Sequence, residues 1–125
     1  MEDKSIIKKR TYEFALNIID LYKLLTTKNE YVLSKQLLKA GTSIGANVEE
    51  ALAGQSRADF LSKMSIASKE ARETNYWLRL IRDSKLLEDH HIKPLIAESS
   101  EIISMLTSIV KTTASSNSKL KTENS

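Results

Sequence analysis

Apolar residues recur along the chain at steps of three and four, the spacing that places side chains on one face of an α-helix. Four segments show this pattern, at residues 6–25, 31–53, 57–84 and 88–113. Their core stripes are formed by Ile7, Phe14, Ile18, Leu21 and Leu25; by Leu33, Leu37, Ala40, Ile44, Val48 and Ala51; by Phe60, Met64, Ala67, Ala71, Thr74, Leu78 and Ile81; and by Ile92, Leu95, Ile96, Ile103, Leu106 and Val110. The connections between the segments are short, which places consecutive helices antiparallel. The pattern therefore predicts an all-α fold, an antiparallel up-down four-helix bundle.

The composition agrees with long helices and few connections. The 125 residues include three glycines and one proline, too few turn residues for an all-β or α/β domain. A hydrophobic content of 41% is enough for one core without disulfides. We assign the bundle to residues 1–113. The segment after Ala114 has a single aliphatic residue, so residues 114–125 are expected to form a disordered C-terminal tail.

Several classes of protein are excluded by what the sequence lacks. Without cysteine it has no disulfide, thiolate zinc site, iron–sulfur cluster or cysteine nucleophile. No stretch approaches the roughly 18 apolar residues of a membrane span, and the acidic start has no apolar region of a signal peptide. We therefore expect a cytoplasmic protein with no membrane partner. The net charge of +3, whose excess lies in residues 1–40, permits contact with nucleic acid without requiring it.

Two of the predicted helices carry a second apolar strip, turned more than about 90° away from the core stripe. The strip on the first helix holds Tyr12, Leu16 and Ile19, and the strip on the third holds Ile66, Trp77 and Leu80. Such a strip either widens the contact with the core or meets another chain. We favour self-association, which makes these six residues the candidate oligomer interface.

Gly41 and Gly45 interrupt the helix predicted at residues 31–53. A glycine within a helix costs up to about 1 kcal/mol relative to alanine. A phosphate-binding loop is excluded, because the segment has no Gly-Lys-Ser/Thr ending and no preceding strand. We expect the glycines to let a neighbouring helix pack closely, with Ala67 and Ala71 as the facing surface.

Polar side chains form stripes on the second and third predicted helices. Five residues share these stripes: Ser43, Asn47, Glu50, Glu70 and Glu73. Paired carboxylates can perform acid–base chemistry or bind metals, but a di-metal bundle uses Glu-x-x-His motifs, which are missing here. The two histidines, His90 and His91, are adjacent and cannot share a helix face. We expect a hydrogen-bonded polar network or interface ladder, with no catalytic site, metal, cofactor or small-molecule substrate.

Cations with an interleaved tyrosine give the most suggestive constellation. Lys69, Arg72, Tyr76 and Arg79 follow at steps of three, four and three, on one outward face of the third helix. The cations can neutralise phosphates, and the tyrosine can stack on an unpaired base. The alternative is a solvated face in which Asp83 pairs with Arg79. A second basic cluster at Lys8, Lys9 and Arg10 is also a candidate for nucleic-acid contact, or a frayed helix end.

Three segments carry a family resemblance, at residues 36–51, 56–60 and 69–80. They include a Ser-Ile-x-x-Asn-Val-x-Glu core followed by a long acidic and aromatic helix. With them, residues 6–113 resemble the bacterial four-helix-bundle proteins of the 23S rRNA intervening-sequence protein family. The family's motif residues correspond here to Ser43, Asn47, Glu50, Glu70, Glu73, Trp77 and Arg79, as a signature without an assigned reaction.

The resemblance implies an assembly as well as a fold. Members of this family are antiparallel four-helix bundles that form homopentamers, some of them encoded within insertions of the large ribosomal RNA gene. A related branch holds the strongly basic accessory proteins of diversity-generating retroelements, which bind nucleic acid and a reverse transcriptase. This chain departs from that branch in its mild charge. We expect a non-enzymatic, ring-like homopentamer that binds RNA or a ribonucleoprotein through basic outer faces; the alternative is a protein-interaction scaffold with no nucleic-acid role.

Overall fold

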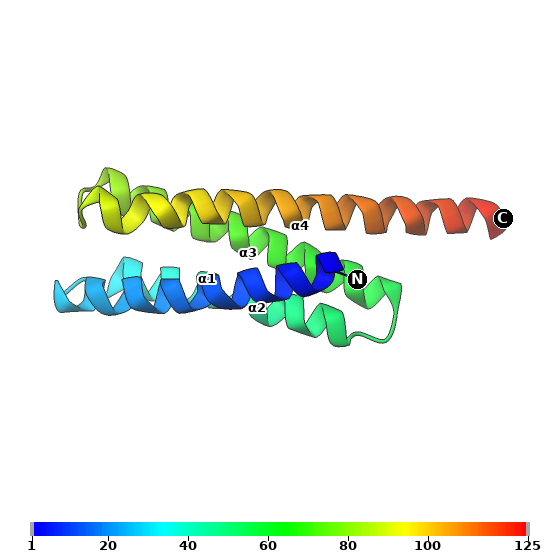
Figure 1. Cartoon of the computed structure of the whole chain (residues 1–125), viewed down its shortest axis with the longest axis horizontal. Coiled ribbons are helices and arrows are strands. Elements are labelled where there is room, and N and C mark those ends of the chain that lie inside the picture. Colours follow the sequence, from blue (N-terminus) through cyan, green and yellow to red (C-terminus); the bar gives the residue numbers. More distant parts are fainter. Residues whose placement is uncertain (1, 125) are drawn as a thin grey trace.

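A computed structural model describes residues 2–124 of the chain, with side chains from Lys4 to Ser115, as four α-helices and no strand. The helices are α1 (Glu2–Thr27), α2 (Val32–Ala53), α3 (Arg57–Asp83) and α4 (Asp89–Asn124). Consecutive helices run in opposite directions (Figure 1). Each packs on two neighbours in a square, in which α2 and α4 separate α1 from α3. The prediction of an all-α four-helix bundle is confirmed.

The core is formed by most of the residues in the stripes that the sequence pattern predicts. Ile7, Phe14 and Ile18 of α1 are completely buried, and so are most of their counterparts in α2 and α3, but the expected Leu33 and Phe60 are only partly buried. In α4 the buried line runs through Ser99 and Ile102, while the expected Ile96, Ile103 and Val110 are only partly buried and pack against its edge. The Ser99 hydroxyl donates to the Ile96 carbonyl at 2.8 Å and accepts from Asn75 Nδ2 at 2.9 Å, which allows a polar side chain in the core.

Gly41 and Gly45 bring α2 close to α1. A Cβ on Gly41 would lie 2.8 Å from the Cγ1 and Cγ2 atoms of Ile18, and one on Gly45 would lie 3.3 Å from the Thr11 carbonyl oxygen. The predicted close packing is present, but its expected partner was wrong. Ala67 and Ala71 are buried in α3. The two glycines lie on the side of α2 that faces α1, so their neighbours are Ile18 and Thr11.

The connections end and begin the helices through backbone and side-chain hydrogen bonds. Asn29 and Lys85 adopt left-handed backbone conformations, with φ of 62° and 59°, just after α1 and α3. In both places the following N–H bonds back to a carbonyl five residues earlier, the geometry of a Schellman C-cap. The α3 helix begins at Ser56, whose hydroxyl accepts from the Asp59 N–H at 3.0 Å.

The last helix is longer than the sequence pattern predicts. The bundle was expected to end at residue 113, but the helical backbone of α4 continues to Asn124 and extends past the other helices (Figure 1). Side chains beyond Ser115 lie outside the described residues, so the disorder of residues 114–125 stays a prediction. None of the helices, over the part that the structure describes, is long and apolar enough to cross a membrane.

Candidate nucleic-acid interface

The four residues Lys69, Arg72, Tyr76 and Arg79 lie exposed on the side of α3 that faces away from the core. We call this set the α3 cationic face. The Arg79 guanidinium carbon is 5.9 Å from the centroid of the Tyr76 ring, within the range of a cation–π contact. The edge of the Tyr76 ring meets the Trp77 ring, with centroids 5.2 Å apart. The structure therefore brings the predicted residues together and presents an aromatic ring between cations.

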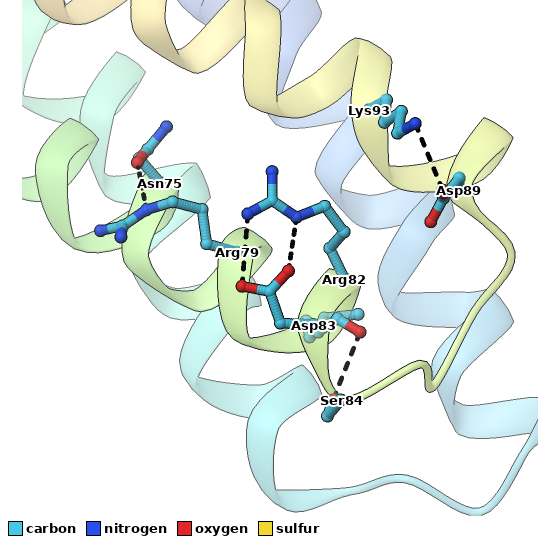
Figure 2. Close-up of polar contacts among 8 residues, drawn as sticks. Asn75, Arg79, Arg82, Asp83, Ser84, Asp89 and Lys93 are labelled. Carbon is cyan, nitrogen blue, oxygen red and sulfur yellow. Dashed lines mark hydrogen bonds and ion pairs between the residues drawn. The ribbon is translucent and has the colours of Figure 1, made fainter.

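Asp83, the acidic residue that the sequence offers as a partner of Arg79, forms its hydrogen bonds elsewhere. Asp83 accepts hydrogen bonds from Arg82 at 2.7 and 3.3 Å, and Arg79 turns toward Asn75, whose Oδ1 accepts from Arg79 Nε at 2.8 Å (Figure 2). The bond from Arg82 is the main reason that the pKa of Asp83 lies below its ordinary value. Pairing of Asp83 with Arg79, the alternative left open by the sequence, is not what the structure shows. The Arg79 charge therefore remains available to an anion.

Residues of α4 extend the candidate interface in a way that the sequence analysis missed. Arg72 Nη2 donates to the Thr107 hydroxyl at 3.2 Å, across a groove of about 540 Å³ between α3 and α4. Two cations and four hydroxyl groups line this groove, together with Ile103: Arg72, Lys111, Ser104, Thr107, Ser108 and Thr112. No carboxylate is among the lining residues. We call this feature the α3/α4 groove.

A signal for the α3/α4 groove was present in the sequence. Ser100, Ser104, Ser108 and Thr112 recur every four residues and form one stripe along α4. Serine and threonine are poor residues for an exposed helix interior, so such a stripe is unusual without a further role. Hydroxyl groups beside cations are suited to contact phosphates, because both donate hydrogen bonds to phosphate oxygens.

The second basic cluster lies elsewhere and is partly neutralised. Lys8, Lys9 and Arg10 belong to α1, which is diagonally opposite α3 in the bundle. Arg10 Nη2 forms an ion pair with Glu101 Oε2 at 2.6 Å, and Lys9 Nζ lies 4.0 Å from Glu13 Oε1. The structure therefore does not join this cluster to the α3 cationic face.

The hydrogen bonds of the two polar stripes lie within single helices, and the alternative of an interface ladder stays a prediction. Ser43 Oγ donates to the Lys39 carbonyl, and Asn47 Nδ2 to the Ser43 carbonyl, both within α2. In the described part of the chain, no hydrogen bond joins two of the five stripe residues from different helices; the contact that crosses is an ion pair of 3.5 Å between Glu50 and Lys63. Within α3, Glu73 accepts from the Trp77 ring nitrogen at 3.2 Å.

Glu70 is the stripe residue with an altered acidity. Burial, and then the neighbouring charge of Glu73, raise its pKa above the ordinary value, while Lys39 and Lys69 oppose the rise. Because Lys39 belongs to α2, this carboxylate faces the α2 side of α3. No group of three His, Cys, Asp or Glu residues that could hold a metal ion occurs among residues 4–115.

The apolar strips lie on opposite sides of the bundle. On α1, Tyr12 and Leu16 are 59% and 48% exposed, and Ile19 is half-buried. On α3, Ile66 and Leu80 are exposed, whereas Trp77 is half-buried against the core. Because α1 and α3 occupy diagonal corners, the two strips form separate apolar surfaces of the bundle.

Comparisons with known proteins bear on the family and the fold of the chain. Residues 3–108 match the family model described as 23S rRNA-intervening sequence protein. The chain is also similar to a crystal structure at 1.70 Å resolution, that of a protein with unknown function from the S23 ribosomal protein family of Bacteroides thetaiotaomicron VPI-5482. The two share 44% sequence identity with a TM-score of 0.83, over 87% of this chain and 98% of the other. Among curated proteins, none matches this chain significantly.

Proposed function

Since the chain belongs to the 23S rRNA-intervening sequence protein family, we propose that it binds RNA, free or within a ribonucleoprotein, through the α3 cationic face. The observation that carries the proposal is the arrangement of Arg72, Tyr76 and Arg79. Arg72 reaches across to the α3/α4 groove, and Arg79 lies beside the Tyr76 ring without an acidic partner in contact. The protein acts in this proposal as a non-enzymatic binding protein of the bacterial cytoplasm.

The chemistry of the face suits single-stranded RNA. Lysine and arginine that neutralise phosphates release counterions, which favours binding at low salt. An exposed tyrosine can stack on an unpaired base of any kind, and stacking contributes about 1–3 kcal/mol per base. The hydroxyl groups and Lys111 of the α3/α4 groove would contact the sugar–phosphate backbone beside that base. The face therefore supports affinity for unpaired RNA more than the reading of a particular sequence.

Assembly into a ring would strengthen this binding. The apolar strips of α1 and α3 differ from each other and lie at diagonal corners, the arrangement that a head-to-tail contact between identical subunits needs. If the rotation closes after five subunits, the weak sites of five copies act on one RNA, and linked sites gain avidity without any new contact. We therefore include a homopentamer in the proposal.

The test is binding of the purified protein to labelled ribosomal RNA fragments and to random RNA, at low and at physiological salt. The oligomer mass is recorded alongside; five copies of the 14.1 kDa chain give about 70 kDa. The variant Lys69→Glu, Arg72→Glu, Arg79→Glu should lose binding and keep the oligomer mass. Where binding by the variant is still measurable at low salt, and if each cation contacts one phosphate, the slope of log affinity against log salt should be shallower by about two per bound subunit.

A control variant of equal charge separates a site from general attraction. Lys23, Lys28 and Lys35 are exposed at the end of the bundle where α1 connects to α2, and none of them belongs to α3. Replacing all three with Glu changes the net charge by the same amount. If this control lost as much RNA affinity as the α3 variant, the α3 cationic face would not be the binding site.

A protein-interaction scaffold is the second candidate, favoured by the exposed apolar residues of α1 and α3. An apolar protein contact responds little to salt, whereas RNA binding weakens steeply. An intact oligomer that binds no RNA at low salt would contradict the first proposal. The partner would then be sought among proteins.

A further inference from the structure

A pocket of about 700 Å³ opens at the end of the bundle where α2 connects to α3. Its lining comes from all four helices and from the connection at Gly54 and Gln55. In Figure 1 this is the end where α1 begins and where α4 extends past its neighbours. The volume lies within the range of pockets that hold small organic ligands. We call it the end pocket.

The floor of the end pocket is apolar and contains an aromatic ring. Leu52, Phe60 and Ile109 are half-buried and pack against the core below. Phe60 begins the core stripe of α3 in the sequence pattern, but its position in the first turns of the helix leaves part of the ring open to the pocket. Lys4 Nζ lies 4.6 Å from the centroid of this ring. The ammonium therefore lies over the ring, and a flat apolar group rests on this floor by taking the place of the Lys4 side chain.

The rim of the end pocket is cationic. Among the described residues that line the pocket, Lys4 and Arg57 are the charged ones, and none of them is a carboxylate. Ser108, Thr112 and Thr113 add hydroxyl groups from α4. A concave site lined by charge of one sign attracts ligands of the opposite sign. A ligand that satisfies the whole site needs a flat apolar part, an anionic group and several hydrogen-bonding atoms.

We propose that the end pocket binds a nucleotide unit, with the base on the Phe60 floor and the phosphate between Lys4 and Arg57. An acyl carboxylate fits less well, because it offers fewer hydrogen-bonding atoms to the Ser108 and Thr112 hydroxyl groups, while Thr113 already donates to the Ile109 carbonyl. The pocket does not include the α3 cationic face, so the inference stands without the proposed function. The two regions are nevertheless continuous, since Ser108 and Thr112 line both the end pocket and the α3/α4 groove. The nucleotide can be a free nucleoside monophosphate or one unit of an RNA strand.

The probe for the free ligand is AMP, followed by saturation-transfer difference NMR and by titration against the full-length protein. We expect transfer to the base protons of AMP and weaker binding of adenosine and of ribose 5-phosphate. Arg57→Glu, at an exposed position, should weaken AMP binding about tenfold. Phe60→Leu, which keeps an apolar side chain and removes the ring, should weaken it about fivefold or more. Lys28→Glu, at the other end of the bundle, should leave it unchanged.

A second arm uses a tetranucleotide with a 5′-phosphate, which separates a strand from a free nucleotide. Tighter binding of the tetranucleotide than of AMP, with the same loss in Arg57→Glu, assigns the pocket to a unit of RNA; equal affinities assign it to free nucleotides, and both results support the inference. Failure of AMP to bind, equal AMP affinity in Arg57→Glu and wild type, or preference for decanoate over AMP overturns it. If AMP does not bind and RNA binding is lost only in the α3 variant, the proposed function holds and the inference about the end pocket is wrong. If AMP binds and RNA does not, the end pocket binds nucleotides and the proposed function is wrong.

Discussion

Gly41 of α2 lies against Ile18 of α1 with no room for a side chain between them. A Cβ on this glycine would come within 2.8 Å of two γ carbons and 3.2 Å of the β carbon of Ile18. Ile18 is completely buried and β-branched, so it has little freedom to turn aside. The close approach of α1 and α2 therefore depends on the absence of one methyl group.

Replacing Gly41 with Ala should destabilise the protein by about 1–2 kcal/mol in urea unfolding, because overpacking outweighs the better helix propensity of alanine. In the background of Ile18→Ala, which removes both γ carbons, the same substitution should cost much less. A double-mutant cycle measures this coupling. Equal costs in the two backgrounds would show that Ile18 is not the obstacle.

A second backbone position can be improved. Lys85 has φ of 59° at the Schellman cap of α3, a conformation that costs a lysine roughly 1 kcal/mol and costs glycine nothing. Lys85→Gly should therefore raise the free energy of unfolding by about 0.5–1 kcal/mol. Lys85→Ala removes the same charge and keeps the strain, so it is the matched control and should show no gain. If Lys85→Gly lost stability and Lys85→Ala did not, the left-handed backbone at Lys85 would not be strained.

The start of α2 depends on one carboxylate. Glu30 accepts hydrogen bonds from the N–H groups of Val32, Leu33 and Ser34 at 3.2, 2.9 and 2.7 Å. Burial raises the pKa of Glu30, but these three bonds act in the opposite direction and hold it below the ordinary value of 4.5. A carboxyl whose pKa is depressed by folding stabilises the protein above its unfolded pKa and loses that effect as the pH falls through the folded one.

Glu30→Gln should therefore lower the stability by about 1 kcal/mol at pH 7, the usual magnitude for loss of an N-terminal cap. The difference from wild type should shrink as the pH falls below the ordinary value of 4.5 and through the lower pKa of the folded protein, where Glu30 itself becomes protonated. Thermal unfolding between pH 3 and pH 7 measures this change. Glu49→Gln, at an exposed position in the second half of α2, is the control that should show neither effect. A difference at pH 7 that persists unchanged at pH 3 would argue against the carboxylate cap.

The features of the fold that the sequence predicted correctly are those that depend on residues close together in the chain. Periodic apolar residues such as Phe14, Ile44 and Leu78 predicted the helices and most of the core, because the spacing alone places them on one face. Ser99 escaped notice because its burial depends on a bond from Asn75 in another helix. The partner of Gly41 was wrong for the same reason. The sequence of one helix shows where small residues allow a close approach. Which neighbouring helix approaches there depends on the packing of the whole bundle.

The same distinction applies to the candidate interface. The α3 cationic face was predictable, since the steps of three and four between its residues place them on one surface. Lys111 and the hydroxyl groups of α4 join it only because α4 packs beside α3. The end pocket could not be predicted at all, as Lys4, Arg57 and Thr112 are brought together from three helices.

The two apolar strips lead to a prediction about assembly. If α1 of one subunit meets α3 of the next, Leu16→Glu and Leu80→Glu should each reduce the oligomer mass measured by light scattering, although the two residues lie on diagonal helices. When the two variants are mixed, the Leu80→Glu variant supplies a wild-type Leu16 and the Leu16→Glu variant a wild-type Leu80. These two residues can form one intact contact, so the expected product is a dimer. Val32→Glu is the control, because Val32 is 73% exposed and lies outside both strips. An oligomer that survives both variants and is lost in Val32→Glu would place the contact at the α1–α2 end of the bundle instead.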